Sequence, residues 1–220
     1  MDRIKVISFD ADGTLVTPYF TDAVWHRAMP ERYAQKERIS LEEARDQVFK
    51  VYREVGEGRM EWYDLEYWFH RFGFSDHRGL LQSQRHLISL YPEVTKVLSA
   101  LGSRYPLIVA SGAARDFLDL LLDGVRGRFA RVFSSVTDHQ SVKTPEFYRE
   151  VCRTMGIEPR EMVHVGDSWD YDFLNSRAAG VRAYYLDRKR LDRKRGKQGE
   201  RVVGDLMEFE ACLRGDSLPV

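Results

Sequence analysis

The chain has 220 residues, which is enough for one large domain or for a core domain with a smaller insert. Hydrophobic residues make up 43% and charged residues 31%, a balance typical of globular proteins that excludes a mostly disordered chain. Because 34 Lys and Arg balance 34 Asp and Glu, the formal net charge is zero, which excludes the broad basic field of a dedicated nucleic-acid-binding protein.

The cysteines and the apolar segments indicate the compartment. Cys152 and Cys212 have the spacing of neither a metal-binding nor a redox motif, and the chain begins without a signal-peptide pattern. No apolar stretch approaches the roughly 20 residues that cross a bilayer. We therefore expect a cytoplasmic protein that binds neither membranes nor nucleic acids and is a monomer or a homodimer.

Short apolar segments alternate with helix-like segments through most of the chain. The first runs from Ile4 to Phe9, is rich in β-branched residues, and ends at the turn-forming residues 10–14. Similar segments lie at residues 107–110, 131–133, 162–165, 183–186 and 201–203. This alternation predicts an α/β fold with a doubly wound parallel sheet.

Residues 17–90 break this alternation, since their apolar residues recur at helical spacing and form no convincing strand. Ser40 and Glu43 form a capping box, which predicts a helix that starts there and ends at Gly56. Its predicted apolar face consists of Leu41, Ala44, Val48, Val51 and Val55. A further aromatic-rich segment is interpreted as core packing and holds Trp62, Leu65, Trp68, Phe69 and Phe72. We expect an α/β core domain at 1–16 and 91–220, and a smaller helical domain at 17–90.

Polar residues that could take part in catalysis or bind a ligand follow the predicted strands. Asp10 and Asp12 stand two residues apart on one turn with Gly13, and adjacent carboxylates repel unless a positive group such as a metal ion lies between them. Ser111 and Gly112 end the second strand and can donate to an anion. Further along come Lys143, just before a helix that begins at Pro145, and the acidic segment 166–172 with Asp167, Asp170 and Asp172.

From residue 10 to residue 180 the chain resembles the haloacid dehalogenase-like (HAD) hydrolase superfamily. The four motifs are residues 9–15, Ser111, Lys143, and residues 166–168 with Asp172. Two positions depart from the family pattern. Thr144 follows Lys143 where the family more often has Pro, and Gly112 follows Ser111 where Asn or Ser is common. The helical segment lies where one branch of the superfamily carries its cap domain.

The resemblance implies a phosphatase in which Asp10 attacks phosphorus and forms an aspartyl phosphate. Asp12 would act as general acid and base, and Asp172 would orient water or Lys143. Mg²⁺ would be held by the Asp10 carboxylate, the Asp12 carbonyl and Asp167. The phosphoryl oxygens would be bound by Gly13, Thr14, Ser111, Gly112 and Lys143.

Three alternatives to a phosphatase stay open. A phosphomutase or phosphotransferase would use the same residues, and a non-catalytic binding protein would keep only the fold. A 2-haloacid dehalogenase also uses an Asp nucleophile, but it needs no metal and typically has a non-acidic residue at the position of Asp12. Asp12 together with Asp167 therefore favours a small phosphorylated metabolite as the substrate.

The sequence leaves specificity and motion less defined. Arg59 is the one cap residue nominated for an anionic substrate group, since its guanidinium suits such a group. The crossings near residues 17–19 and 90–92 are expected to act as hinges of a moving lid. The basic residues between 188 and 197 are expected to form a solvated loop without an assigned function.

Overall fold

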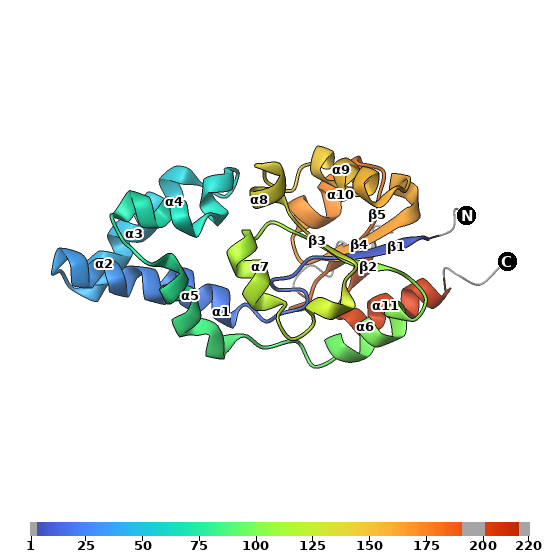
Figure 1. Cartoon of the computed structure of the whole chain (residues 1–220), viewed down its shortest axis with the longest axis horizontal. Coiled ribbons are helices and arrows are strands. Elements are labelled where there is room, and N and C mark those ends of the chain that lie inside the picture. Colours follow the sequence, from blue (N-terminus) through green and yellow to red (C-terminus); the bar gives the residue numbers. More distant parts are fainter. Residues whose placement is uncertain (1–3, 191–200, 216–220) are drawn as a thin grey trace.

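Six strands form one parallel sheet in the computed structural model, which describes residues 4–190 and 201–215 (Figure 1). They are β1 (Val6–Phe9), β2 (Leu107–Ser111), β3 (Arg131–Ser134), β4 (Met162–Gly166), β5 (Arg182–Leu186) and β6 (Val202–Val203). Each predicted strand segment is present, and every strand pair is parallel, in the order β3-β2-β1-β4-β5-β6. The predicted α/β fold with a doubly wound parallel sheet is confirmed.

Helices cover both faces of this sheet (Figure 1). Side chains of β1 alternate between the two faces, so Ile7 and Phe9 enter one apolar cluster and Val6 enters the other. The first face is covered by α6 (Val94–Gly102), α7 (Arg115–Leu121) and α11 (Leu206–Gly215). On the second side lie α8 (Ser135–His139), α9 (Pro145–Met155) and α10 (Asn175–Ala178), of which α9 contributes buried side chains to the second cluster (Figure 1). The short helices η4 (Arg126–Arg128), η5 (Pro159–Glu161) and η6 (Trp169–Leu174) lie in the connections between strands.

The strand order determines where a site can form. Strand β1 lies between β2 and β4, so the chain continues outward from it in both directions. At such a switch point the loops that follow neighbouring strands separate and leave a crevice at the carboxyl edge of the sheet. Three of the four predicted motifs lie at the ends of β1, β2 and β4 or in the loops that follow them and therefore border this crevice, and the other, Lys143, lies between α8 and α9 after β3.

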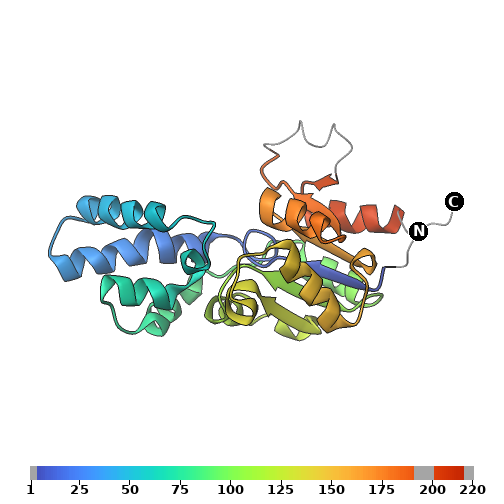
Figure 2. The same ribbon diagram turned by 90° about the horizontal axis from the view of Figure 1, so that it is seen from above.

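A group of helices between β1 and α6 lies beside the sheet (Figures 1 and 2). We call residues 19–87 the helical insert; its elements are α1 (Tyr19–Ala23), η1 (Val24–Ala28), α2 (Met29–Glu37), α3 (Leu41–Val55), η2 (Met60–Tyr63), α4 (Leu65–Phe72), α5 (His77–Gln84) and η3 (Arg85–Leu87). The predicted helical character of this segment is thus observed. The boundaries of a separate domain at 17–90 stay a prediction.

The predicted capping box is present at the start of α3. The Ser40 hydroxyl accepts from the Glu43 amide at 3.2 Å, and the Glu43 carboxylate accepts from the Ser40 amide at 3.1 Å. Gly56 ends the helix with a φ of +77°. The predicted buried face is correct for Ala44 and Val48 but wrong for Leu41, which is 36% exposed in the first turn.

Two chain segments join the insert to the core, and they pair with each other. Val16 and Leu90 form an antiparallel bridge. The Thr17 amide donates to the Ser89 carbonyl at 2.8 Å, and the Tyr91 amide donates to the Leu15 carbonyl at 3.1 Å. The two crossings therefore form one short paired connection.

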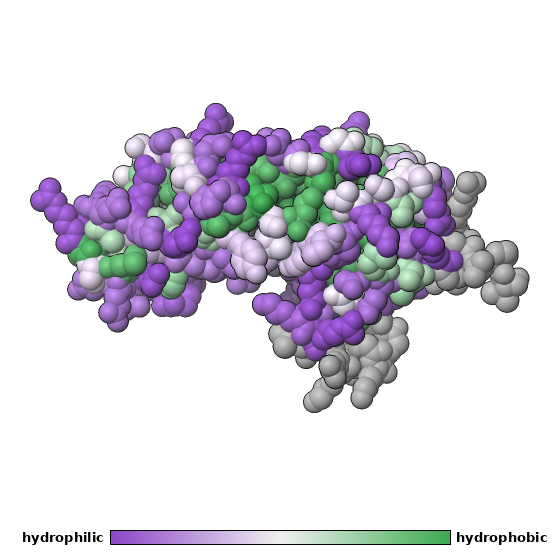
Figure 3. All heavy atoms as spheres, turned by 90° about the horizontal axis from the view of Figure 1, so that it is seen from below, coloured by the Kyte–Doolittle hydropathy of each residue, from purple (hydrophilic) through white to green (hydrophobic). Residues whose placement is uncertain are grey.

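The face drawn in Figure 3 is mostly hydrophilic, and apolar side chains gather in its middle, where the insert meets the core. No helix in the described residues is long and apolar enough to cross a membrane. Cys152 is buried, and no disulfide joins it to Cys212.

We predict that Ser40→Ala lowers the free energy of unfolding by about 1 kcal/mol, because the amide of Glu43 loses its acceptor. Urea unfolding followed by circular dichroism measures this change. Ser75→Ala is the matched control, since Ser75 is an exposed serine outside any helix. Equal losses in the two variants would contradict a stabilising cap.

Candidate active site

The turn after β1 is fixed by the backbone. The Asp10 amide donates to the Val165 carbonyl at 2.9 Å, which ties the turn to β4. The amides of Leu15 and Val16 both donate to the Ala11 carbonyl, at 2.8 and 3.0 Å. Asp10 and Asp12 therefore project from a rigid support at the carboxyl edge of the sheet.

Gly13 is required at this turn for two reasons. Its φ of +71° disfavours any residue with a side chain, and an added Cβ would lie 2.1 Å from Oδ2 of Asp167. The Gly13 amide donates to the Val16 carbonyl at 2.8 Å. The predicted phosphate-binding residues Gly13 and Thr14 are not among the residues that line the cavity described below, so the structure does not bring them to it.

Lys143 lies at the centre of the charged cluster. Its Nζ donates to Oδ1 of Asp10 at 2.9 Å and to Oδ1 of Asp172 at 2.5 Å, and all three side chains are at least nine-tenths buried. Burial opposes the charge on Lys143, but Asp10 and Asp172 outweigh it and hold the pKa of its ammonium well above the ordinary value. Lys143 therefore carries a permanent positive charge beside Asp10.

Asp172 is held from several sides. His164 Nε2 lies 3.0 Å from its Oδ1, and the Ser168 amide donates to its Oδ2 at 3.0 Å. Burial opposes its ionisation, but Lys143 and His164 keep its pKa below the usual range. Gly166 makes room for it, since an added Cβ there would lie 2.3 Å from the Asp172 Cγ.

His164 is a contributor to the site that sequence reasoning missed. It is fully buried on β4, and its Nδ1 lies 2.9 Å from the Ser8 hydroxyl on the neighbouring strand. The available signal was a polar side chain within the apolar strand Met162–Val165, opposite Ser8 in the first strand. Its contact with Asp172 depends on the fold of residues 166–172.

The carboxylates of the site outnumber its positive groups. One oxygen each from Asp10, Asp167 and Asp172 lies within 4.8 Å of the others. Burial raises the pKa values of Asp10 and Asp167, although the Asp167 side chain still reaches the cavity, and repulsion between the carboxylates adds to this effect. Burial also raises the pKa of Asp12 to about 7, and its buried Oδ1 has no hydrogen-bond partner among the described residues.

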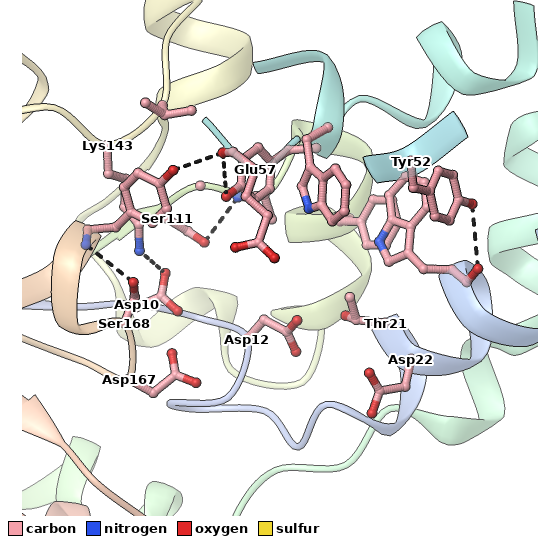
Figure 4. Close-up of a pocket in the computed structure, with 18 of the residues that line it drawn as sticks. Asp10, Asp12, Thr21, Asp22, Tyr52, Glu57, Ser111, Lys143, Asp167 and Ser168 are labelled. Atoms are coloured by element: carbon pink, nitrogen blue, oxygen red, sulfur yellow. Dashed lines mark hydrogen bonds and ion pairs between the residues drawn. The ribbon is translucent and has the colours of Figure 1, made fainter. Parts of the chain in front are cut away.

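These observations fit a divalent cation. Asp172 is already saturated by donors, whereas Asp10, Asp12 and Asp167 offer oxygen atoms on the same side of the cavity (Figure 4). A hard cation such as Mg²⁺ prefers a set of oxygen ligands of this kind. A bound cation would also offset the burial and the mutual repulsion that raise the pKa values of Asp10, Asp12 and Asp167.

Ser111 and Lys143 approach Asp10 from the other loops (Figure 4). Ser111 is 2% exposed at the end of β2, and its hydroxyl accepts from the Ala113 amide at 3.3 Å. Thr144 caps α9, since its hydroxyl accepts from the Phe147 amide at 3.3 Å. The departure from the family pattern after Lys143 thus supplies a helix cap.

A cavity of about 610 Å³ opens between this cluster and the helical insert. Asp10, Asp12, Ser111, Gly112, Lys143, Asp167 and Asp172 line it, so the structure brings seven of the predicted site residues together. Arg59, the predicted cap residue, is not among the lining residues and instead pairs with Glu61 at 2.5 Å. From the insert, Asp22, Arg53 and Glu57 line the cavity together with His26.

Arg188 supports the turn after β1 through contacts with the backbone of that turn. Its guanidinium donates to the carbonyls of Gly13 at 3.1 Å and Thr14 at 2.6 Å, pairs with Glu93 at 2.8 Å, and lies 3.5 Å over the Tyr91 ring. The prediction of a solvated loop is therefore wrong for Arg188, because these contacts bury much of its side chain. Residues 191–197 of the basic run lie outside the described residues.

A family model for haloacid dehalogenase-like hydrolases matches residues 4–180. A phosphoglycolate phosphatase of Chromobacterium violaceum is 27% identical over 190 residues, which cover 83% of this chain and 85% of that protein. The GMP/IMP nucleotidase YrfG of Escherichia coli is 29% identical over 70 residues, only 32% of this chain and 31% of that protein. The crystal structure of a HAD phosphatase from Thermococcus onnurineus superposes with a TM-score of 0.82 and 23% identity, over 96% of this chain and 98% of that chain.

We predict that Arg188→Lys lowers the free energy of unfolding by roughly 1–3 kcal/mol, because one ammonium cannot serve both carbonyls and Glu93 at once. Hydrogen exchange at the amides of residues 13–16 should accelerate in the same variant. Arg190→Lys is the control, since Arg190 forms an exposed pair with Glu208 and should change stability by less than about 0.5 kcal/mol. Equal effects of the two substitutions would contradict the supporting role of Arg188.

Proposed function

The chain belongs to the haloacid dehalogenase-like hydrolases, and we propose that it is a Mg²⁺-dependent phosphatase that hydrolyses a small phosphomonoester through an aspartyl phosphate. Phosphatases are among the relatives that match most of its length. The observation that carries the proposal is the buried Asp10 carboxylate, which is held by Lys143 at 2.9 Å and lines the cavity together with Asp12.

The donor set supports Mg²⁺ as the cofactor. The Asp10 carboxylate, the Asp12 carbonyl and the Asp167 carboxylate would hold it, since these oxygens are the ligands that a hard cation prefers. When bound, it supplies positive charge that offsets the repulsion between the phosphoryl oxygens and the carboxylates. The raised pKa values of Asp10 and Asp167 are consistent with this assignment, because burial and the neighbouring carboxylates both oppose their negative charge and a cation would offset this.

Asp10 supplies the nucleophile. Its carboxylate oxygen forms a bond to phosphorus while the bond from phosphorus to the leaving oxygen breaks. Lys143 holds Oδ1 of Asp10, so it orients the carboxylate for attack. The hydrogen bond from the Asp10 amide to the Val165 carbonyl fixes Asp10 at the edge of the sheet.

Asp12 moves the protons. It donates one to the leaving oxygen in the first step, and in the second step it accepts one from the water that attacks the aspartyl phosphate. A carboxyl group whose pKa is about 7 is populated in both protonation states near neutral pH, which suits both steps.

The phosphoryl oxygens are bound by Ser111, the Gly112 amide and Lys143. These groups line the same cavity as Asp10, and the low exposure of Ser111 and Lys143 strengthens the action of their charges and dipoles. Asp172 keeps Lys143 in place through the contact between Nζ and Oδ1. Asp172 is therefore proposed as a positioning residue.

The insert acts as a lid over this chemistry. The Tyr171 hydroxyl on the core donates to the Glu57 carbonyl of the insert at 2.8 Å, which ties the two parts together beside the cavity. The paired crossings at Val16 and Leu90 would serve as the hinge. Closure would exclude bulk water from the aspartyl phosphate until the hydrolytic water is in place.

Substitution of the two turn carboxylates should separate their roles. We expect Asp10→Asn to abolish turnover of p-nitrophenyl phosphate, because an amide cannot form the acyl phosphate. Asp12→Asn should lower kcat by roughly 10² to 10⁴, the usual value of general acid or base assistance. Asp46→Asn, which removes one exposed carboxylate of α3, is the control and should turn over normally. Full activity of Asp10→Asn would refute the proposed nucleophile.

Removal of the metal should stop the reaction. We expect hydrolysis of p-nitrophenyl phosphate to fall to background after treatment with EDTA and to return when Mg²⁺ is added. Circular dichroism of the treated protein should stay unchanged, which separates loss of the cofactor from unfolding. Turnover undiminished by the chelator would refute the metal dependence.

A further inference from the structure

The cavity extends well beyond the groups that handle phosphate. Its volume of about 610 Å³ lies within the roughly 300–1,000 Å³ of pockets that bury drug-sized ligands. A phosphorylated short hydroxy acid would fill only the end near Asp10. The rest of the cavity is therefore available to the leaving group of a larger phosphomonoester.

Aromatic side chains dominate this second part. Figure 4 shows Asp10, Asp12 and Asp167 at one end, Tyr52 at the other, and aromatic rings between them. Apart from Tyr171 of the core, the aromatic lining residues are Trp25, Phe49, Tyr52, Trp62, Tyr63, Trp68 and Phe117. We call this group the aromatic subsite. All of them except Phe117 belong to the helical insert.

The rings of the aromatic subsite are held in place by one another. Trp25 stacks on Phe117 of the core with 5.6 Å between the ring centroids and an interplanar angle of 5°. Tyr52 is buried and meets Trp25, Trp62 and Trp68 edge to face at 6.1, 5.9 and 4.6 Å. A wall of rings fixed in this way loses little conformational entropy when a ligand binds.

Part of this wall is available to a ligand. Trp25, Phe49 and Trp62 are only half-buried, although they pack against the core cluster. Among the described residues, no hydrogen bond reaches the indole N–H of Trp25 or Trp62, whereas Trp68 donates to the Trp62 carbonyl at 3.2 Å. Flat apolar surface with nearby N–H donors suits a planar ring that carries heteroatoms.

The charges near the aromatic subsite do not favour a second anionic group. Asp22 and Glu57 offset Arg53, and Asp22 already pairs with His26 at 3.5 Å. A leaving group with an additional carboxylate or phosphate would find no excess of positive charge on the insert side of the cavity.

We infer that the substrate is a phosphomonoester whose leaving group carries a planar aromatic or heteroaromatic ring, which stacks within the aromatic subsite. This inference rests on the proposed phosphatase function and names its substrate class. A nucleoside and a simple benzylic alcohol share this chemistry, so both are included in the test. Trp62 is the proposed specificity-determining residue, because it is half-buried, lines the cavity and belongs to the short helix η2.

The first measurement compares two substrates with chemically similar alkyl leaving groups. Benzyl phosphate carries a ring and ethyl phosphate does not, so the ratio of their kcat/KM values measures the contribution of the ring. By analogy with bases stacked on aromatic side chains, we expect a ratio of roughly 5 to 150 in favour of benzyl phosphate. A ratio near one would overturn the inference. Adenosine 5′-monophosphate against ribose 5-phosphate gives the same comparison for a nucleoside and identifies which ring the subsite prefers.

Substitution at Trp62 tests the site itself. Trp62→Leu should reduce the benzyl-to-ethyl ratio of kcat/KM to near one, and Trp62→Phe, which keeps a ring, should restore most of it. Tyr33→Leu is the matched control, because Tyr33 is an insert ring that packs on Phe72 and Phe74 away from the cavity. An unchanged ratio in Trp62→Leu, or an equal fall in Tyr33→Leu, would overturn the assignment of the subsite.

A binding measurement separates failure of this inference from failure of the proposed function. If neither phosphate ester is hydrolysed in the presence of Mg²⁺, the proposed phosphatase function fails. Calorimetric titration of the Asp10→Asn protein with adenosine 5′-monophosphate, benzyl phosphate and ribose 5-phosphate then tests the subsite without turnover. The subsite is supported if either ring-bearing ligand binds more tightly than ribose 5-phosphate and if this difference disappears in the double variant that combines Asp10→Asn with Trp62→Leu. Equal binding of all three ligands overturns it.

Discussion

The repulsion among carboxylates gathered around one buried lysine is the constraint on which the site depends. Asp10 and Asp172 share the ammonium of Lys143, and Asp12 and Asp167 add two further carboxylates to the same cavity. In a poorly hydrated site such charges interact far more strongly than in water. The fold therefore maintains an arrangement that one lysine does not neutralise, and this imbalance favours a bound cation.

The sheet order and the insert make this arrangement possible. Strands β1, β2 and β4 are neighbours, so residues more than 100 positions apart end at one edge. The chain leaves the core after Val16 and returns at Leu90, and these two residues pair with each other. The helical insert can therefore lie beside that edge of the sheet without interrupting the strands. In the proposed function, the core thus holds the groups that handle phosphate, and the insert supplies the wall that faces the leaving group.

Much of this could be predicted from the sequence, because the decisive signals are local. A strand that ends in polar residues predicts both the sheet and the place of Asp10, Ser111 and Asp167, and the capping box marks the start of α3. Two other contacts have no signal of this kind in the sequence. Arg188 reaches Gly13 across 175 positions, and His164 meets Asp172 only after the loop folds back. Arg59 was expected to contact the substrate, but it forms an ion pair with Glu61, two residues away.

The formation of an aspartyl phosphate on Asp10 is the central claim, and trapping it is the most direct test. The protein would be mixed with Mg²⁺ and p-nitrophenyl phosphate, quenched in acid within the first turnover, and digested for peptide mass spectrometry. We predict one phosphoryl group on Asp10 of the peptide that contains residues 9–15, and none in Asp10→Asn. A phosphoryl group on Asp12, or no covalent species while turnover proceeds rapidly, would contradict the role assigned to Asp10.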